Sequence, residues 1–330
     1  MAHIKPVIII DEGERSDVFA STLLDEPTDA HPDSHRWWVL LAVVGSVFCA
    51  GLTVTILTVA VDDIGKDFNV SRAIASLVVT APFTFRAVFI PAFGRITDRY
   101  GRRRVWLWGF GVSTLASFAC AFAPNVGSLV ALRAVSAIAG AAVLPSSLAL
   151  LSDAFPPHER VRAMAWWSAA SGFAPLLGIV LGGIALEHLS WRWLFIGQAP
   201  PSIITFIVGA IVLEERAGDR RPIDVYGIVL SIIACGALVL AVNRGLDSTW
   251  DYLGVGTVLC LSVGGLAAWM FVRVELRHPA PVVPIHLFRI PSVRAAMAAT
   301  FWVNFAYLGG FNVTTYLMRD PSLYGMGPRD

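Results

Sequence analysis

The sequence predicts an all-α integral membrane protein that crosses the bilayer with about nine transmembrane helices. Three observations support this prediction. Apolar residues make up 56% of the 330 residues and charged residues only 15%, and the mean hydropathy is +0.66, which is far outside the range of soluble domains. Apolar runs of about twenty residues recur along the chain. Lysine and arginine are concentrated in every second connection between these runs.

Each apolar run is long enough to cross the hydrocarbon core as a helix, which satisfies its own backbone hydrogen bonds there. The nine expected spans are residues 38–61, 74–94, 105–123, 127–152, 161–186, 192–213, 223–243, 252–272 and 293–318. Residues 1–37 are mostly polar and lack the apolar region of a cleavable signal peptide. We expect this segment to be a disordered cytoplasmic tail.

The distribution of basic residues predicts the orientation of the chain. If the amino terminus is inside the cell, the inner connections hold fourteen arginines, and the outer ones hold only Lys66, Arg72, Arg192 and Arg244. Cytoplasmic loops carry the excess of lysine and arginine. The amino terminus and the connection after the second span are therefore expected on the cytoplasmic side of the plasma (inner) membrane.

The connection after the second span, GRITDRYGRRR at residues 94–104, holds five arginines and one aspartate. Two interpretations of Asp98 remain open. It could form a local ion pair that moderates the positive charge of the loop. Alternatively, a tight turn between Gly94 and Gly101 could hold Asp98 toward the positive amino-terminal end of a helix in another bundle. Such an attraction is worth about 0.3–1 kcal/mol when exposed and up to about 2 kcal/mol when partly buried.

The same segment resembles the signature loop of the major facilitator superfamily, G-x-L-a-D-r-x-G-r-r-r. The matching residues are Gly94, Asp98, Arg99, Gly101, Arg102 and Arg103. The resemblance implies a major facilitator-type helix bundle in which these residues form a conformational gate at the inward face.

Later segments are similar to the fourteen-span drug:proton antiporters of that superfamily. LVALRAVSAIAGAAVLPSSLALLSDAFPPHERVRAMA resembles the fourth span and its following loop, and GIVLGGIALEHLSWRWLFIGQAP resembles the end of the fifth span and the start of the sixth. The resemblance implies an N-terminal six-helix bundle at 38–213 and a linker with two extra transmembrane helices at 214–276. A cytoplasmic loop and the first helix of an incomplete C-terminal bundle follow at 277–330.

Several positions depart from the family's pattern. Ile179 stands where the fifth span usually has proline, Thr53 where the first span usually has an acid, and Ser136-Ala137 where Q-G usually follows the arginine. We therefore do not carry the substrate or the coupling ion over from the family residue by residue.

Two arginines lie within expected spans, where a charge costs at least about 2.5–3.5 kcal/mol. Arg133 matches the fourth-span arginine that the resemblance implicates in proton coupling, although it could instead snorkel to the headgroups. Arg86 could pair with a polar or acidic residue of another helix, or face the substrate. We expect both to line a cavity with Thr53, Thr55, Thr84, Ser171 and Gln198. Because both buried charges are positive, this cavity would suit an anionic or amphipathic solute better than a multivalent cation. The span interiors contain no evident Asp or Glu, so the sequence identifies no proton carrier.

Small residues in the fourth and fifth spans predict close helix packing at the bundle interface. In the fifth span these are Gly172, Gly178, Gly182 and Gly183, and in the fourth Ala137, Ala139, Gly140 and Ala141.

The expected function is secondary active efflux of small amphipathic, drug-like molecules, coupled by resemblance to proton influx. The expected partners are a small-molecule substrate, protons and the lipid bilayer. We expect no catalytic residue, because no HExxH, GxSxG or P-loop spacing appears. We expect no nucleic acid, because the basic residues are dispersed among the inner connections. No cofactor or metal is expected. The resemblance implies about five further spans, so we expect the chain to be truncated and inactive alone. A non-transporting membrane regulatory or assembly subunit derived from a transporter half is the alternative.

Overall fold

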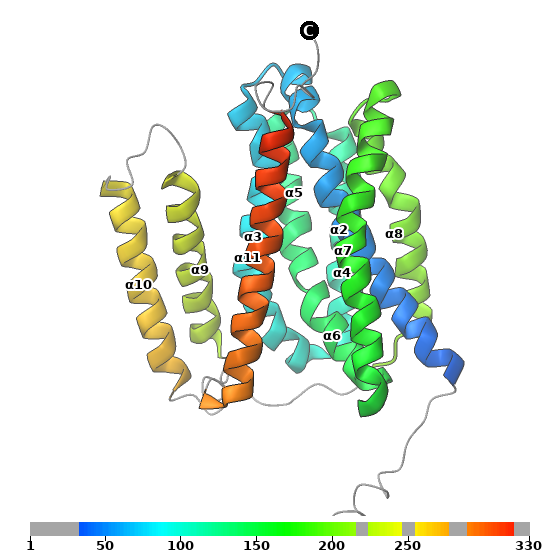
Figure 1. Ribbon diagram of the computed structural model, residues 1–330, viewed down its shortest axis with the longest axis vertical. Helices are drawn as coiled ribbons and strands as arrows, with labels where there is room; N and C mark the ends of the chain where they lie inside the picture. The colour runs from blue at the N-terminus through cyan, green and yellow to red at the C-terminus, as the bar shows by residue number, and fades with distance from the viewer. Residues whose placement is uncertain (1–32, 216–223, 246–254, 277–288, 320–330) are drawn as a thin grey trace, which may run out of the picture.

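A computed structural model of the chain describes residues 33–215, 224–245, 255–276 and 289–319. All elements within these ranges are helices, and most of the longer ones run along the vertical axis of the view in Figure 1, with α2 inclined to the others. The first seven α-helices and one short 3-10 helix are α2 (Asp33–Asp67), α3 (Arg72–Tyr100), α4 (Arg102–Ala119), η1 (Cys120–Phe122), α5 (Val126–Ala141), α6 (Val143–Ala154), α7 (Pro157–His188) and α8 (Arg192–Val212). They are followed by α9 (Val225–Gly245), α10 (Val255–Glu275) and α11 (Pro291–Arg319).

The helices confirm the all-α membrane prediction. Within the described residues, seven helical stretches are long and apolar enough to cross a membrane: α2, α3, α4 with η1, α5 with α6, α7, α8 and α10. The other two predicted spans coincide with α9, whose described apolar stretch is Val225–Ala241, and with α11. Large apolar side chains such as Ile211 and Trp108 lie exposed on the outside of these rods, as expected where lipid replaces water.

The start of α2 corrects one prediction. The helix begins at Asp33, within the segment expected to be disordered, and the remainder of that segment lies outside the described residues. Two contacts explain the early start. Arg36 forms an ion pair with Glu159 at 3.1 Å, and Trp37 packs edge-on against Phe155 at a centroid distance of 6.0 Å. The first turn of α2 is thereby attached to the corner between α6 and α7.

The predicted span 127–152 is not one continuous helix. It is divided into α5 and α6 at Ala142, which lies between the two helices. Pro145 explains the break, because its ring nitrogen cannot donate to the carbonyl of Ala141 and its ring crowds that turn.

The helix packing relies on small residues, but not in the arrangement expected. A Cβ atom on Gly178 would lie 3.0 Å from the carbonyl oxygen of Leu52, and one on Gly182 would lie 3.2 Å from the Cα of Ile56. Both glycines therefore let α7 pack against α2 within the same bundle. Gly183, which was predicted to pack, would meet nothing within 4 Å.

The other small residues also fall into two groups, those in close contact with a neighbouring helix and those with open space around them. Gly172 also has open space, whereas Gly140 approaches the Ser113 side chain of α4. A Cβ on Gly109 of α4 would lie 2.8 Å from the carbonyl oxygen of Ala139. The small residues of α5 thus permit its close contact with α4.

The buried core is divided into two apolar clusters along the length of the bundle. One contains Val43, Trp106 and Leu151, and the other contains Ile64, Leu129 and Phe195. On α2, Cys49 belongs to the first cluster and Leu52 to the second. Polar side chains such as Thr53 lie in the interior of the bundle at the height where one cluster ends and the other begins.

At the far end of α2, Arg192 joins three elements. Its guanidinium donates to the carbonyl oxygens of Ala121 and Ala123 at 2.9 and 3.0 Å, and it forms an ion pair with Asp67 at 3.4 Å. Trp191 donates to the same carboxylate at 3.1 Å. Because these residues lie on or beside α2, η1 and α8, this arginine links the ends of three elements at one end of the bundle.

Candidate functional site

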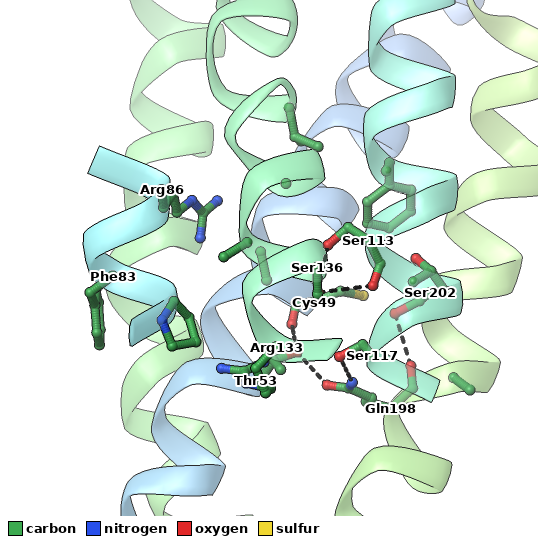
Figure 2. A pocket seen from close by; sticks show the side chains of 18 residues that line it. Cys49, Thr53, Phe83, Arg86, Ser113, Ser117, Arg133, Ser136, Gln198 and Ser202 are labelled. Atoms are coloured by element: carbon green, nitrogen blue, oxygen red, sulfur yellow. Dashed lines mark hydrogen bonds between the residues drawn. The ribbon is translucent and has the colours of Figure 1, made fainter. Parts of the chain in front are cut away.

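A pocket lies inside the bundle between the two apolar clusters. Its eighteen lining residues come from α2, α3, α4, α5, α6 and α8 and enclose about 720 Å³, including space open to the surroundings. Nine of them are polar: Thr53, Arg86, Ser113, Thr114, Ser117, Arg133, Ser136, Gln198 and Ser202. Four of these, Thr53, Arg86, Arg133 and Gln198, were predicted from the sequence, and the structure brings them together (Figure 2).

Gln198 of α8 connects three helices across the pocket. Its amide nitrogen donates to the hydroxyl of Ser117 at 2.6 Å, and its amide oxygen accepts a hydrogen bond from Thr53. Ser113 and Ser136 form a second bridge, 3.1 Å long, between α4 and α5. The neutral polar groups on this wall of the pocket therefore satisfy one another, as buried polar groups require.

Arg133 of α5 is buried, with only 4% of its surface exposed. Its Nε donates to the carbonyl oxygen of Val78 on α3 at 3.3 Å. The structure thus argues against snorkelling to the headgroups, because the side chain stays within the bundle.

Arg86 of α3 is half-buried and lines the pocket. Figure 2 shows its guanidinium projecting from α3 toward α5. It forms no ion pair or hydrogen bond with a residue that the structure describes. The buried pair considered for Arg86 is therefore not formed within the described residues.

Three residues expected in the cavity do not line this pocket. Thr55, Thr84 and Ser171 each donate to a backbone carbonyl one turn earlier in their own helices, at 3.3, 3.3 and 2.8 Å. Such a bond satisfies a hydroxyl without a partner helix. The polar lining residues that the sequence prediction missed are the serines of α4, α5 and α8 and Thr114, which carry no charge to distinguish them in an apolar run.

The connection between α3 and α4 consists of the single residue Gly101. Its φ of 98° and ψ of 140° are favourable only for glycine. Gly94 was predicted to belong to this turn, but it lies inside α3, and a Cβ there would meet nothing within 4 Å. Asp98 lies in the last turn of α3, exposed, and forms no ion pair with a described residue.

The arginines beside the turn bind other parts of the bundle. Arg102 forms an ion pair with Asp153 and donates to the carbonyl oxygen of Ala149 at 3.3 Å. Arg103 donates to the carbonyl oxygen of Ala210 at 2.8 Å. These bonds attach the start of α4 to α6 and α8. Neither arginine forms an ion pair with Asp98 in the described residues.

The described residues contain no group of three or more histidine, cysteine, aspartate or glutamate side chains that could hold a metal ion. The pocket lining itself offers hydroxyl and amide groups, two guanidinium groups and apolar side chains.

Comparison with known proteins identifies the family to which this helical bundle belongs. The family model described as Major Facilitator Superfamily matches residues 43–328. The chain is 33% identical over 294 residues to the multidrug resistance protein Stp of Mycobacterium tuberculosis, covering 87% of this chain and 54% of that protein. It is 30% identical over 290 residues to the fatty acid resistance protein FarB of Neisseria gonorrhoeae, covering 86% of this chain and 56% of that protein.

Among solved structures, the fold is similar to the peptide transporter POT in complex with sulfate. The TM-score is 0.54 at 15% sequence identity, covering 77% of this chain and 54% of that one. At this identity the likeness concerns the fold alone. The chain spans about half the length of the curated relatives it matches.

Proposed function

This chain belongs to the major facilitator superfamily, and on that premise we propose that it serves the secondary active export of small amphipathic, drug-like molecules in exchange for protons. The observation that carries the proposal is the polar pocket inside the bundle. Substrate sites in such carriers lie near the middle of the membrane between helices. A pocket that lies between two apolar clusters and combines serine, threonine and amide groups with apolar walls suits an amphipathic molecule.

We place proton coupling in the same pocket, at or near Arg133. Support comes from the match of this arginine to the family's fourth-span position and from its burial beside α3. The pocket lining includes no carboxylate among the described residues, so in this proposal Arg133 acts on a proton carrier that is not part of the lining.

We assign the gating role to Asp98 and the turn at Gly101. In this proposal the bonds of Arg102 and Arg103 keep the start of α4 fixed to the bundle. The carboxylate of Asp98 is then available to contact the amino-terminal end of a helix outside the described bundle. Such a contact would stabilise one conformation of the carrier and be released in the other.

The proposed setting is the plasma (inner) membrane, with several spans and a cytoplasmic amino terminus. We further propose a six-helix bundle at 38–213 and a linker with two extra spans at 214–276. The packing of α9 against α10 and α3 agrees with this division. The names of the relatives reported above favour export over the regulatory-subunit alternative.

The decisive experiment measures efflux of a fluorescent amphipathic probe from preloaded cells that express this chain together with the further spans that we expect the whole carrier to have. We expect efflux to stop when nigericin abolishes the pH gradient and to continue when valinomycin changes only the membrane potential. Retention of the probe whether or not the gene is expressed would contradict export, and efflux insensitive to both ionophores would contradict proton coupling.

A further inference from the structure

We propose that the pocket selects molecules carrying an anionic group, and that Arg86 is the residue that binds this group. This inference rests on the proposed function, because it names the substrate class of the same pocket. It is a specificity assignment for the chain's own residues and does not depend on the coupling ion.

The charges of the pocket are the first argument. Of the eighteen lining residues, two are arginines, and none is aspartate, glutamate or histidine. Both guanidinium groups line the same pocket. An anion that enters this pocket is attracted by both charges, whereas a cation would add a third like charge.

The two arginines differ in how they are held. Arg133 is buried and donates its Nε proton to a backbone carbonyl of α3, so it contributes a positive charge at a fixed position. Arg86 is half-buried and makes no hydrogen bond with a described residue. Its planar fork of N–H donors is therefore available to a carboxylate, which it can bind with two parallel hydrogen bonds.

The neutral polar residues of the pocket add no negative charge that could bind a cation. The hydroxyl and amide groups of Thr53, Ser117 and Gln198 are engaged with one another, so they do not create a site for a cation. Figure 2 shows this bridge joining Thr53, Gln198 and Ser117, with Arg86 on a separate helix.

The apolar part of the lining fits the remainder of such a molecule. Phe83 lies one helical turn before Arg86 on α3, and Phe110 and Val143 line the same pocket from α4 and α6. Residues three positions apart share one face of a helix. An apolar body could therefore contact Phe83 while its anionic group reaches the guanidinium of Arg86. The expected ligand is an amphipathic monoanion such as a fatty acid.

A binding experiment on the purified chain in an uncharged detergent tests this assignment. The probes are a saturated fatty acid, the alcohol and the quaternary ammonium compound of the same chain length, with binding followed by displacement of a fluorescent fatty acid. We expect the carboxylate to bind at least about tenfold more tightly than the ammonium compound, equivalent to about 1.4 kcal/mol.

Variants of Arg86 assign the preference to this residue. Arg86→Gln should remove the advantage of the carboxylate while leaving the affinity for the alcohol unchanged, and Arg86→Lys should retain part of the advantage. Arg86→Glu should reverse it in favour of the ammonium compound. Arg273→Gln on α10, where the arginine is exposed beside Trp269 and does not line the pocket, is the matched control and should bind as the unmodified chain does.

Two results would overturn the inference: equal affinity for the carboxylate and ammonium probes, or an unchanged preference in a folded Arg86→Gln variant. Size-exclusion profiles verify folding, and the reversal expected for Arg86→Glu does not depend on loss of binding. If anions bind selectively but no probe is exported from cells, the proposed export function fails and the binding assignment stands. If probes are exported regardless of their charge, the proposed export function stands and the assignment of an anionic substrate to Arg86 fails.

Discussion

The guanidinium of Arg102 forms an ion pair with the carboxylate of Asp153 on α6 and not with Asp98, its neighbour across the turn. Asp153 therefore has a structural partner, whereas Asp98 is exposed without an ion pair to any described residue. The two acids lie near the same end of the bundle and differ in what their charges contact, which makes them a matched pair for mutation.

Replacing Asp98 by asparagine should leave folding unchanged but impair export. The stability change should stay within about 0.5 kcal/mol, because the side chain is exposed. If the carboxylate contacts a helix end with about 1–2 kcal/mol, its loss changes the conformational equilibrium by about five- to thirtyfold. Efflux rate and thermal stability are the measurements. Asp153→Asn should instead lower stability, because it leaves Arg102 without its ion pair. Equal export by Asp98→Asn and the unmodified carrier would contradict the gating role.

Gly101→Ala should destabilise the chain by about 1–3 kcal/mol, because a Cβ atom disfavours the backbone conformation there. Gly94→Ala is the control. It lies within α3 with open space around it, so alanine should be neutral or stabilise by up to about 1 kcal/mol. Unfolding in mixed micelles, followed by circular dichroism, measures both. Similar free energies of unfolding for the two variants would mean that the turn does not require glycine.

Gly178→Ala should separate α7 from α2, since the added methyl group would crowd the Leu52 carbonyl and the Thr55 side chain. The expected cost is about 1–3 kcal/mol. Gly183→Ala adds the same group where nothing lies within 4 Å and should cost nothing. The same unfolding measurement compares them, and a loss of stability in the Gly183 variant alone would contradict the packing described above.

Arg133→Met should abolish export without destabilising the protein. The charge is buried and has no acidic partner among the pocket residues, so an apolar side chain of similar length removes a desolvation cost. Arg273→Met on α10, where the arginine is exposed beside Trp269, is the control and should export normally. Efflux and unfolding are measured on both. A strong loss of stability with normal export would assign Arg133 a structural role.

The sequence predicted the spans well because apolar length alone determines where a helix can cross a bilayer. It also identified Arg86, Arg133 and Gln198 as residues that line one pocket, because charged and amide groups in apolar runs need a common interior. Of the four hydroxyl residues expected there, only Thr53 lines the pocket. The break at Ala142 was missed although Pro145 signals it, because the apolar run continues through the proline.

Other features could not be inferred from the sequence. The hydroxyl of serine or threonine can donate to a carbonyl of its own helix, as in Thr55 and Ser171. It can also hydrogen-bond to another helix, as in Ser117. The residue type does not tell which of the two occurs. The local ion pair considered for Asp98 was equally plausible by proximity. It does not form with Arg102 or Arg103 because these arginines begin a new helix and turn toward α6 and α8.

The attachment of the first turn of α2 to the corner between α6 and α7 has a practical consequence for handling the protein. Because Arg36 and Trp37 are held by Glu159 and Phe155, a bulky fluorophore or affinity tag fused directly at Asp33 would compete for that corner. A flexible spacer ahead of this position should preserve the native arrangement, and a reporter dye placed there would sense movements of the neighbouring helices rather than the tail alone.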